Sequence, residues 1–377
     1  MNINELLKVS IERGASDLHI KVGNPPVLRI DGVLTPMVEQ KRVTQEDAIS
    51  IAFSVMSGPQ KEKFREKNEL DLAYSVSGLG RFRVNVFQQR GTIGMVLRTI
   101  PVRIRTFEEL YLPEVLKKIS MEPRGLILVT GTTGSGKTTT LAAMIDYINT
   151  NRTDHIMTIE DPIEFLHRDK RSLVNQREIG SDTESFSGAL RSALRQDPDV
   201  ILVGEMRDFE TIQTALVAAE TGHLVLSTLH TIDAAETINR VIAVFPPYQQ
   251  KQIRLQIASV LKGIISMRLV PKSDGVGRVP AIEVLVATTT IKDCIIDPDK
   301  TKLINDFISA GHSQYGMQTF DQSLMKLYTD GLITYEEALK RCTNPDDFAL
   351  KVKGIQSTSD LTWQEKKEEV KIERFGV

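Results

Sequence analysis

The spacing of hydrophobic residues changes near residue 100 and divides the chain into two parts. Before that point, short apolar runs alternate with polar positions between turn residues, which is typical of strands. Two helices are expected here, over 3–13 and from the N-cap Thr44 to about residue 56, where Ser57-Gly58-Pro59 ends the pattern. The predicted strands cover 18–22, 27–30, 33–34, 70–76, 81–88 and 95–100. We therefore expect a small mixed α+β domain over 1–100.

Beyond a short linker at 101–106, the pattern changes to apolar strands that alternate with helices over 107–290. This alternation predicts an α/β domain built on a parallel sheet. Residues 291–355 have helical spacing, and 356–377 are rich in charge, which predicts a mobile tail.

The segment Gly131 to Thr138 fits the phosphate-binding pattern G-x-x-x-x-G-K-[ST], between an apolar strand and a helix. In this pattern backbone N–H groups surround phosphate oxygens, Lys137 reaches the β- and γ-phosphates, and the Thr138 hydroxyl ligates Mg²⁺. A tight glycine turn without a ligand is the alternative, but it does not require this strand–loop–helix context. The predicted nucleotide-binding residues are Thr133, Gly134, Ser135, Gly136, Lys137, Thr138 and Thr139. The sequence predicts that the chain binds ATP with Mg²⁺.

Composition limits the partners and the cellular compartment that can be expected for this protein. The net charge of −2 gives no general reason to expect nucleic acid or an anionic membrane as a partner. No apolar run approaches the roughly 20 residues of a membrane span. The first residues lack the pattern of a signal peptide, and the isolated Cys294 and Cys342 predict neither a zinc knuckle nor a disulfide framework. We expect a cytoplasmic protein without direct membrane insertion.

Acidic residues cluster where the predicted strand 156–159 ends, at Glu160, Asp161 and Glu164. In an open α/β sheet, ligands lie beyond the carboxyl ends of the strands. A carboxylate there can polarise an attacking water, and either Glu160 or Glu164 is placed to do so. A solvated acidic turn is the alternative interpretation.

The next two strand ends carry further candidates. The apolar run 200–203 resembles a Walker B strand, with Gly204 at the usual aspartate position and Glu205 one residue later. Glu205 is predicted to hold Mg²⁺ through water, or alternatively to cap a helix. His230 ends the following strand, where it could bond the γ-phosphate or be an ordinary core histidine. His223 lies seven residues earlier, over about 20 Å away on a strand, so the two histidines cannot share one metal.

Four ordered segments, 14–20, 158–165, 194–208 and 221–231, are together similar to the secretion-superfamily hexameric ATPases, and within them to the PilT-like type IV pilus retraction motors. The resemblance covers about 3–290. It implies a PAS-like N-terminal domain, a RecA-like P-loop NTPase domain with a C-terminal helical region, and a ring of six chains. It also implies ATP hydrolysis with Glu164 as catalytic base and Glu205 as the Walker B acid.

The first domain contributes two arginines to this expectation. Alternation along 81–86 places Phe82, Val84 and Val86 in the core and leaves Arg83 on the other face of the sheet. By the same resemblance, Arg83 and Arg98 match arginines that close on the triphosphate. A solvated sheet face with surface arginines is the alternative.

Further details bear on the subgroup. The segment 269–280 contains no cysteine where extension ATPases carry a zinc insert, and the chain begins almost directly at the PAS-like domain, so retraction in twitching motility is favoured. The segment 316–322 looks more like PilU, which leaves open the principal or the accessory motor. The partners implied are an inner-membrane pilus platform protein and a paralogous retraction ATPase, with the ring peripheral at the inner face of the membrane. Less favoured are a VirB11-like secretion or DNA-transfer ATPase, a P-loop kinase and a non-enzymatic scaffold.

Overall fold

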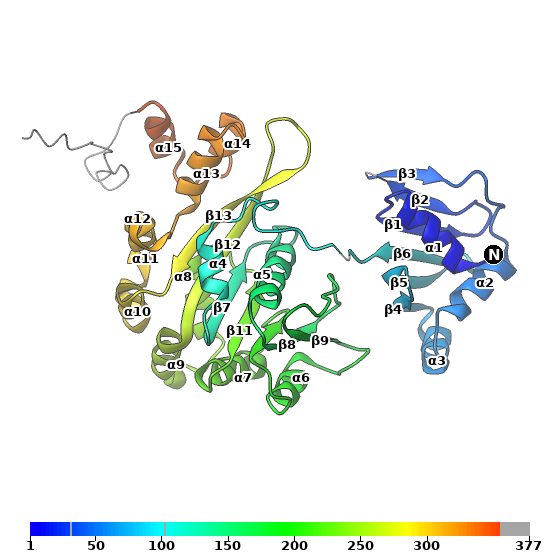
Figure 1. Cartoon of the computed structure of the whole chain (residues 1–377), viewed down its shortest axis with the longest axis horizontal. Helices are drawn as coiled ribbons and strands as arrows, with labels where there is room; N and C mark the ends of the chain where they lie inside the picture. The colour runs from blue at the N-terminus through cyan, green and yellow to red at the C-terminus, as the bar shows by residue number, and fades with distance from the viewer. Residues whose placement is uncertain (31, 102, 355–377) are drawn as a thin grey trace, which may run out of the picture.

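A computed structural model describes residues 1–30, 32–101 and 103–354, which form two bodies joined by a thin connection (Figure 1). The N-terminal body contains a six-stranded antiparallel sheet with strand order β3-β2-β1-β6-β5-β4. Its elements are α1 (Ile3–Glu12), β1 (Asp17–Lys21), β2 (Val27–Ile30), β3 (Val33–Pro36), α2 (Gln45–Ser54), α3 (Gly58–Lys67), β4 (Glu69–Val76), β5 (Gly80–Gln89) and β6 (Thr92–Thr99).

Alternate positions of these strands pack with the three helices into one core. Phe82, Val84 and Val86 of β5 are fully buried in it. Because successive strand residues point to opposite faces, Arg81 and Arg83 lie on the face away from this core. The alternation in the sequence therefore predicted the two faces of β5.

Two local predictions in this body were wrong. Ser57-Gly58-Pro59 was predicted to end a helix, but it also begins the next one: Ser57 caps α3 and Pro59 lies in its first turn. Proline fits the first turn of a helix, where its missing N–H costs nothing, so the same residues serve as a helix start. Strand β6 also begins at Thr92, three residues before the predicted start at residue 95.

The second body contains a seven-stranded sheet with the order β13-β12-β7-β11-β10-β8-β9. The strands are parallel, except that β13 pairs antiparallel with β12. The strands are β7 (Gly125–Thr130), β8 (His155–Glu160), β9 (Leu173–Glu178), β10 (Val200–Val203), β11 (Leu224–Leu229), β12 (Leu261–Pro271) and β13 (Arg278–Val286). The helices between them are α4 (Val115–Ser120), α5 (Lys137–Asn151), α6 (Phe186–Ala193), α7 (Phe209–Glu220), α8 (Ala234–Ala243) and α9 (Pro247–Val260). The edge strand β9 was not predicted.

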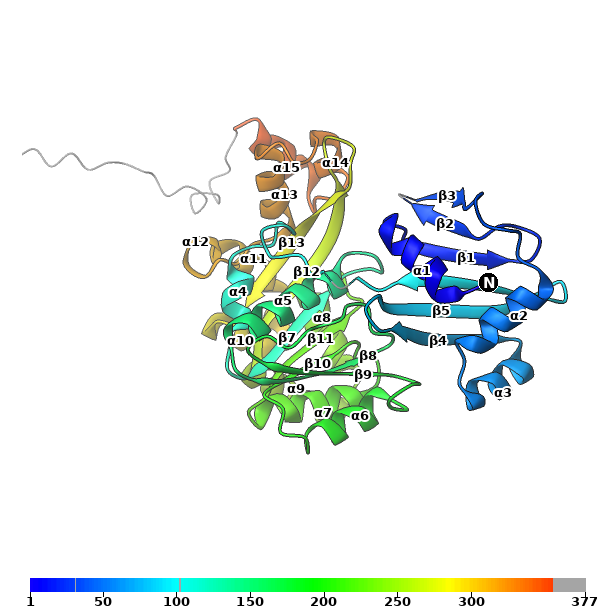
Figure 2. The same cartoon turned by 45° about the vertical axis from the view of Figure 1, so that its right-hand side comes forward.

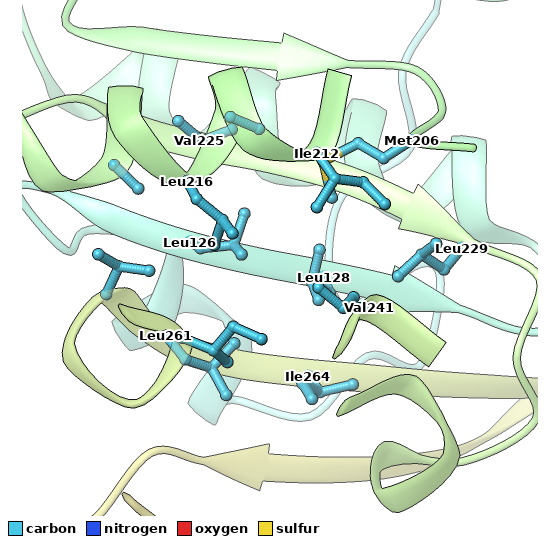
Figure 3. Close-up of a cluster of buried hydrophobic side chains, with 14 of the residues drawn as sticks. Leu126, Leu128, Met206, Ile212, Leu216, Val225, Leu229, Val241, Leu261 and Ile264 are labelled. Atoms are coloured by element: carbon cyan, nitrogen blue, oxygen red, sulfur yellow. The ribbon is translucent and has the colours of Figure 1, made fainter. Parts of the chain in front are cut away.

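Both faces of this sheet are covered, as expected for parallel strands. Leu126 and Leu128 of β7 point into a cluster with α6 to α9, part of which is shown in Figure 3. The intervening Ile127 and Val129 point to the other face, against α4 and α5. Strands buried on both faces read as continuous apolar runs, and this is why the sequence identified them.

The C-terminal region is helical, as the spacing indicated. It contains α10 (Thr289–Ile296), the 3₁₀ helix η1 (Pro298–Leu303), α11 (Ile304–Ala310), α12 (His312–Tyr315), α13 (Phe320–Thr329), α14 (Tyr335–Leu339) and α15 (Pro345–Val352). Helices α13 to α15 pack on the far half of the β12–β13 hairpin. The tail predicted at 356–377 and linker residue Val102 lie outside the described residues. Within the described part of the chain, no helix combines the length and the apolar character that crossing a membrane demands.

Candidate active site

The phosphate-binding segment lies between the end of β7 at Thr130 and the start of α5 at Lys137. Gly131 has φ of 140°, and a Cβ atom there would come within 2.6 Å of the Met267 carbonyl oxygen, so the tight turn requires glycine. The Lys137 ammonium donates to the carbonyl oxygens of Gly131, at 2.8 Å, and Thr132, at 3.1 Å. Burial lowers the pKa of Lys137, and the nearby Glu164 charge acts in the opposite direction.

A cavity of about 630 Å³ opens over this loop. It is lined from three directions, by the start of α5, by the acidic loop after β8 and by the ends of β10 and β11. The predicted residues that line it are Thr133, Gly134, Gly136, Lys137, Thr138, Thr139, Glu160, Glu164, Glu205 and His230. Ser135 lies beneath the loop instead, 3% exposed, and its Oγ has no hydrogen-bond partner among the described residues. Ser135 therefore does not face a ligand in this cavity.

The two glutamates of the acidic loop have different environments. Glu160, the last residue of β8, is buried and accepts hydrogen bonds from Thr158 Oγ1, at 2.7 Å, and Gln176 Nε2, at 3.1 Å. Burial raises the pKa of Glu160, although these hydrogen bonds oppose the shift. Glu164 is exposed and lines the cavity. Glu160 also lines the cavity, but it is 7% exposed, so Glu164 is the more accessible of the two carboxylates.

Glu205 and His230 meet at the neighbouring strand ends. His230 Nε2 lies 3.3 Å from Glu205 Oε1, and Arg207 forms an ion pair with the same carboxylate. Burial, followed by the charges of Lys137 and Arg207, lowers the pKa of His230. A neutral imidazole is therefore favoured at this position. His223 lies at the other end of β11, where its Nδ1 is 2.9 Å from the Ala218 carbonyl oxygen.

Arg83 and Arg98 do not line this cavity. They are paired across β5 and β6, and Arg98 Nε donates to Asp17 Oδ1 at 2.8 Å. Arg98 is exposed, although its neighbour Leu97 on the other face of β6 is buried in the core. Arg83 lines a smaller cavity of about 300 Å³ between the two domains.

The cavity also contains residues that the sequence analysis did not single out. Arg207 follows the Walker B-like strand by four positions, and its basic charge beside Glu205 was a usable signal. Arg278 starts β13 and His167 follows the acidic loop, and both line the cavity although neither belongs to a recognisable motif. A second cavity of about 460 Å³ lies on the other side of α5, lined by Tyr111, Thr139 and the β12–β13 hairpin.

The residues present fit a magnesium ion shared with a triphosphate. Mg²⁺ is usually held by one or two protein ligands together with substrate phosphates and water. Thr138 and Glu205 line the same cavity and offer a hydroxyl and a carboxylate. In residues 1–30, 32–101 and 103–354, no group of three or more His, Cys, Asp or Glu side chains forms a separate metal site.

Comparison with known proteins adds the family context. Residues 1–324 match the family described as type II/IV secretion system protein. The chain is 49% identical over 352 residues to the type IV pilus retractation ATPase PilT of Pseudomonas aeruginosa, covering 92% of this chain and 100% of that protein. It is 44% identical over 361 residues to the type IV pilus ATPase PilU of the same organism, covering 96% and 94%.

Solved structures agree with these relatives. The crystal structure of the pilus retraction motor PilT with bound ADP superposes with a TM-score of 0.85 at 49% identity, covering 92% of this chain and 98% of that one. The ATPase DotB of Legionella pneumophila gives a TM-score of 0.77 at 27% identity, with coverages of 94% and 96%. The phosphate-binding loop, its flanking carboxylates and this similarity together identify the chain as an ATP-hydrolysing member of the type II/IV secretion ATPase family, in the group of the type IV pilus retraction ATPase PilT.

Proposed function

We propose that the chain is a motor that hydrolyses ATP to power retraction of type IV pili, and so twitching motility. The observation that carries this proposal is the single cavity in which the phosphate-binding loop meets Glu164 and Glu205. The 49% identity to a protein named as a retraction ATPase supports the specific task.

Sheet order suggests how ATP lies in the site. The candidate carboxylates follow β8 and β10, which lie to one side of β7, whereas β12 and β13 lie to its other side. With the β-phosphate at the loop, the γ-phosphate points toward the carboxylates. The nucleoside then extends toward the second cavity, where the Tyr111 ring and Lys272, whose Nζ is 4.9 Å from the ring centroid, offer a face for a base.

Each residue then has a defined task. Lys137 leaves the loop carbonyls and binds the β- and γ-phosphate oxygens. Thr138, and Glu205 through water, would hold Mg²⁺, which would supply positive charge to neutralise the transferring group. Glu164 takes a proton from the attacking water. The neutral His230 hydrogen-bonds the γ-phosphate. Glu160 is 7% exposed and already accepts two side-chain hydrogen bonds, so its role is to support the loop.

The motor assembly is also a proposal. The first domain is PAS-like, the second is RecA-like, and six chains form a ring. Arg83 and Arg98 lie on the sheet face away from the core of the first domain and reach a triphosphate when that domain closes over a site. Their guanidinium groups stabilise charge on the phosphoryl group, and closure that depends on the γ-phosphate couples hydrolysis to domain movement.

The ring works in the cytoplasm, peripheral at the inner face of the membrane, against a pilus platform protein. The identities of 49% with PilT and 44% with PilU favour the principal motor, and an accessory PilU-like motor that acts with a paralogue is the alternative.

A deletion strain tests this function. Cells without the protein should extend pili that do not retract, so surface pili are retained while twitching is lost. Wild-type protein should restore retraction, and the Lys137→Ala variant at equal abundance should not. Loss of surface pili in the deletion strain would contradict retraction and indicate a role in assembly. Retraction that persists at reduced force would indicate the accessory motor.

A further inference from the structure

One buried carboxylate connects the N-terminal domain to the loop that carries Glu164. Glu178 ends β9, and its side chain is 7% exposed. Its Oε2 atom accepts a hydrogen bond from Arg81 Nη2 of the N-terminal domain, at 3.1 Å, and from the backbone N–H of Ile163, at 3.2 Å. Among the residues that the structure describes, Arg81–Glu178 is the side-chain ion pair that joins the two domains.

The contact acts on the acidic loop at its centre. Ile163 is 2% exposed and directly precedes Glu164, so the hydrogen bond to Glu178 fixes the Pro162–Ile163 peptide, one residue before Glu164. Burial raises the pKa of Glu160, at the end of the neighbouring strand β8, and the backbone N–H of Glu164 acts to lower it. The acidic loop therefore lies against buried carboxylates of two neighbouring strands.

The other end of the contact is fixed in the N-terminal domain. Arg81 lies near the start of β5, and its carbonyl oxygen accepts the N–H of Ile100, at 3.0 Å, just before the linker. Its side chain is 20% exposed. In Figure 2, the end of β4 and the start of β5 face the side of the second sheet that contains β8 and β9. Beside the ion pair, the cavity of about 300 Å³ is lined by both domains, including Asp161 and Pro162 of the acidic loop.

We propose that Arg81 and Glu178 are positioning residues that couple the placement of the N-terminal domain to the placement of Glu164. With the domain in place, the Arg81 guanidinium holds the Glu178 carboxylate in the rotamer that accepts the Ile163 N–H. When the domain moves away, a buried carboxylate without its cation turns toward water, because a buried charge is costly without a partner. The Ile163 N–H then loses its acceptor and the loop loosens. Domain movement thus controls hydrolysis in the same chain, and this control rests on the proposed role of Glu164.

Hydrogen exchange tests the linkage without depending on activity. Pro162 has no N–H, so a peptide covering 161–166 reports mainly on Ile163 and its neighbours. In full-length Arg81→Ala, this peptide should exchange at least about tenfold faster than in the wild type, while the buried strand β7 should not change. The ATP turnover rate should fall about tenfold, with the nucleotide dissociation constant within about twofold, because the phosphate-binding loop is untouched.

Arg152→Ala is the matched control. Arg152 is 17% exposed and pairs with Asp154, which lies just before β8, at the opposite end of that strand from the acidic loop, so its loss should lower stability without loosening 161–166. Glu178→Gln adds a second test, because its amide oxygen can still accept the Ile163 N–H. It should loosen the loop less than Glu178→Ala. Adding Arg81→Ala to Glu178→Ala should have almost no further effect, since both act through one contact.

The outcomes are distinct. Unchanged exchange at 161–166 in folded Arg81→Ala, or loosening equal to that in Arg152→Ala, would overturn the proposal. If Arg81→Ala does not fold, Arg81→Lys, which keeps the charge with fewer donors, should loosen the loop partially, and wild-type exchange in it would also overturn the linkage. Loosening with an unchanged turnover rate would overturn the coupling to hydrolysis. If the wild type shows no ATP turnover while exchange responds as expected, the linkage stands and the proposed function fails.

Discussion

Replacing Glu164 by glutamine removes one negative charge from the cavity and almost no volume. Removal of a general base typically slows proton transfer by 10²- to 10⁴-fold, which at 1.36 kcal/mol per factor of ten is about 3–5 kcal/mol of transition-state stabilisation. We expect this loss in the hydrolysis rate of Glu164→Gln. Because Glu164 is exposed, thermal stability should stay within about 0.5 kcal/mol. Nucleotide affinity should hold or increase, since a charge that repels the triphosphate is gone.

Glu160→Gln should be compared with Glu164→Gln, because Glu160 is the other candidate for the catalytic base. Glu160 is 7% exposed and accepts the hydrogen bonds from Thr158 and Gln176 at one oxygen, Oε1, so a glutamine can keep both with its amide oxygen but buries an N–H₂ group at the other position. A buried polar group without a partner costs about 1–3 kcal/mol. This variant should therefore melt earlier than Glu164→Gln and lose less of its hydrolysis rate.

Single-turnover phosphate release, binding of a fluorescent nucleotide and thermal melts on the same preparations separate the two effects. If Glu164→Gln hydrolyses ATP at the parental rate while a folded Glu160→Gln does not, the assignment from exposure is refuted and Glu160 is the base.

Four further predictions follow from the same geometry. Lys137→Ala should weaken ATP binding at least about tenfold, because a charged donor worth about 1.5–3 kcal/mol is lost, and the rise in melting temperature with nucleotide should disappear. Burial lowers the pKa of His167 from 6.5 to about 4, so between these pH values the unfolded chain binds a proton that the folded chain does not. The free energy of unfolding should therefore fall by up to about 3 kcal/mol from pH 6.5 to pH 4, and in His167→Gln it should depend less on pH. Arg98→Ala should cost about 1–3 kcal/mol in a thermal melt because Asp17, 4% exposed, loses a donor, whereas Arg83→Ala should cost under about 1 kcal/mol; equal losses would contradict this distinction. Light scattering with nucleotide should show six chains, and a fully active monomer would exclude the ring.

The sequence indicated most of the cavity because its residues follow strand ends. In a parallel sheet the carboxyl ends of strands meet at one edge, so Lys137, Glu164, Glu205 and His230 could be assigned to one place without any distance. Arg278 could not be found in this way. It lies at the start of the antiparallel strand β13, which pairs with β12 through a hairpin. The spacing of apolar residues does not show that this strand start reaches the phosphate-binding loop.

Contacts between domains were the other omission. Alternation assigned Arg81 and Arg83 to the same open face of β5, but it carried no information on what lies opposite that face. Glu178 was missed with its strand, because β9 has polar residues at Asn175, Gln176 and Arg177 and so lacks the apolar run that marked the central strands. Edge position explains this composition, since only one side of β9 pairs with another strand.

The unusual Walker B end has a steric cause. Gly204 follows β10 where the backbone of β8 passes closest: its N–H donates to the Ile159 carbonyl oxygen at 2.8 Å, and a Cβ atom there would lie 3.2 Å from that oxygen and 3.4 Å from Glu160 Cα. An aspartate at this position would require the facing β8 backbone to shift by a few tenths of an ångström. Placing the acid at Glu205 keeps this close contact. Glu164 and Glu205, which follow the adjacent strands β8 and β10, line the same cavity.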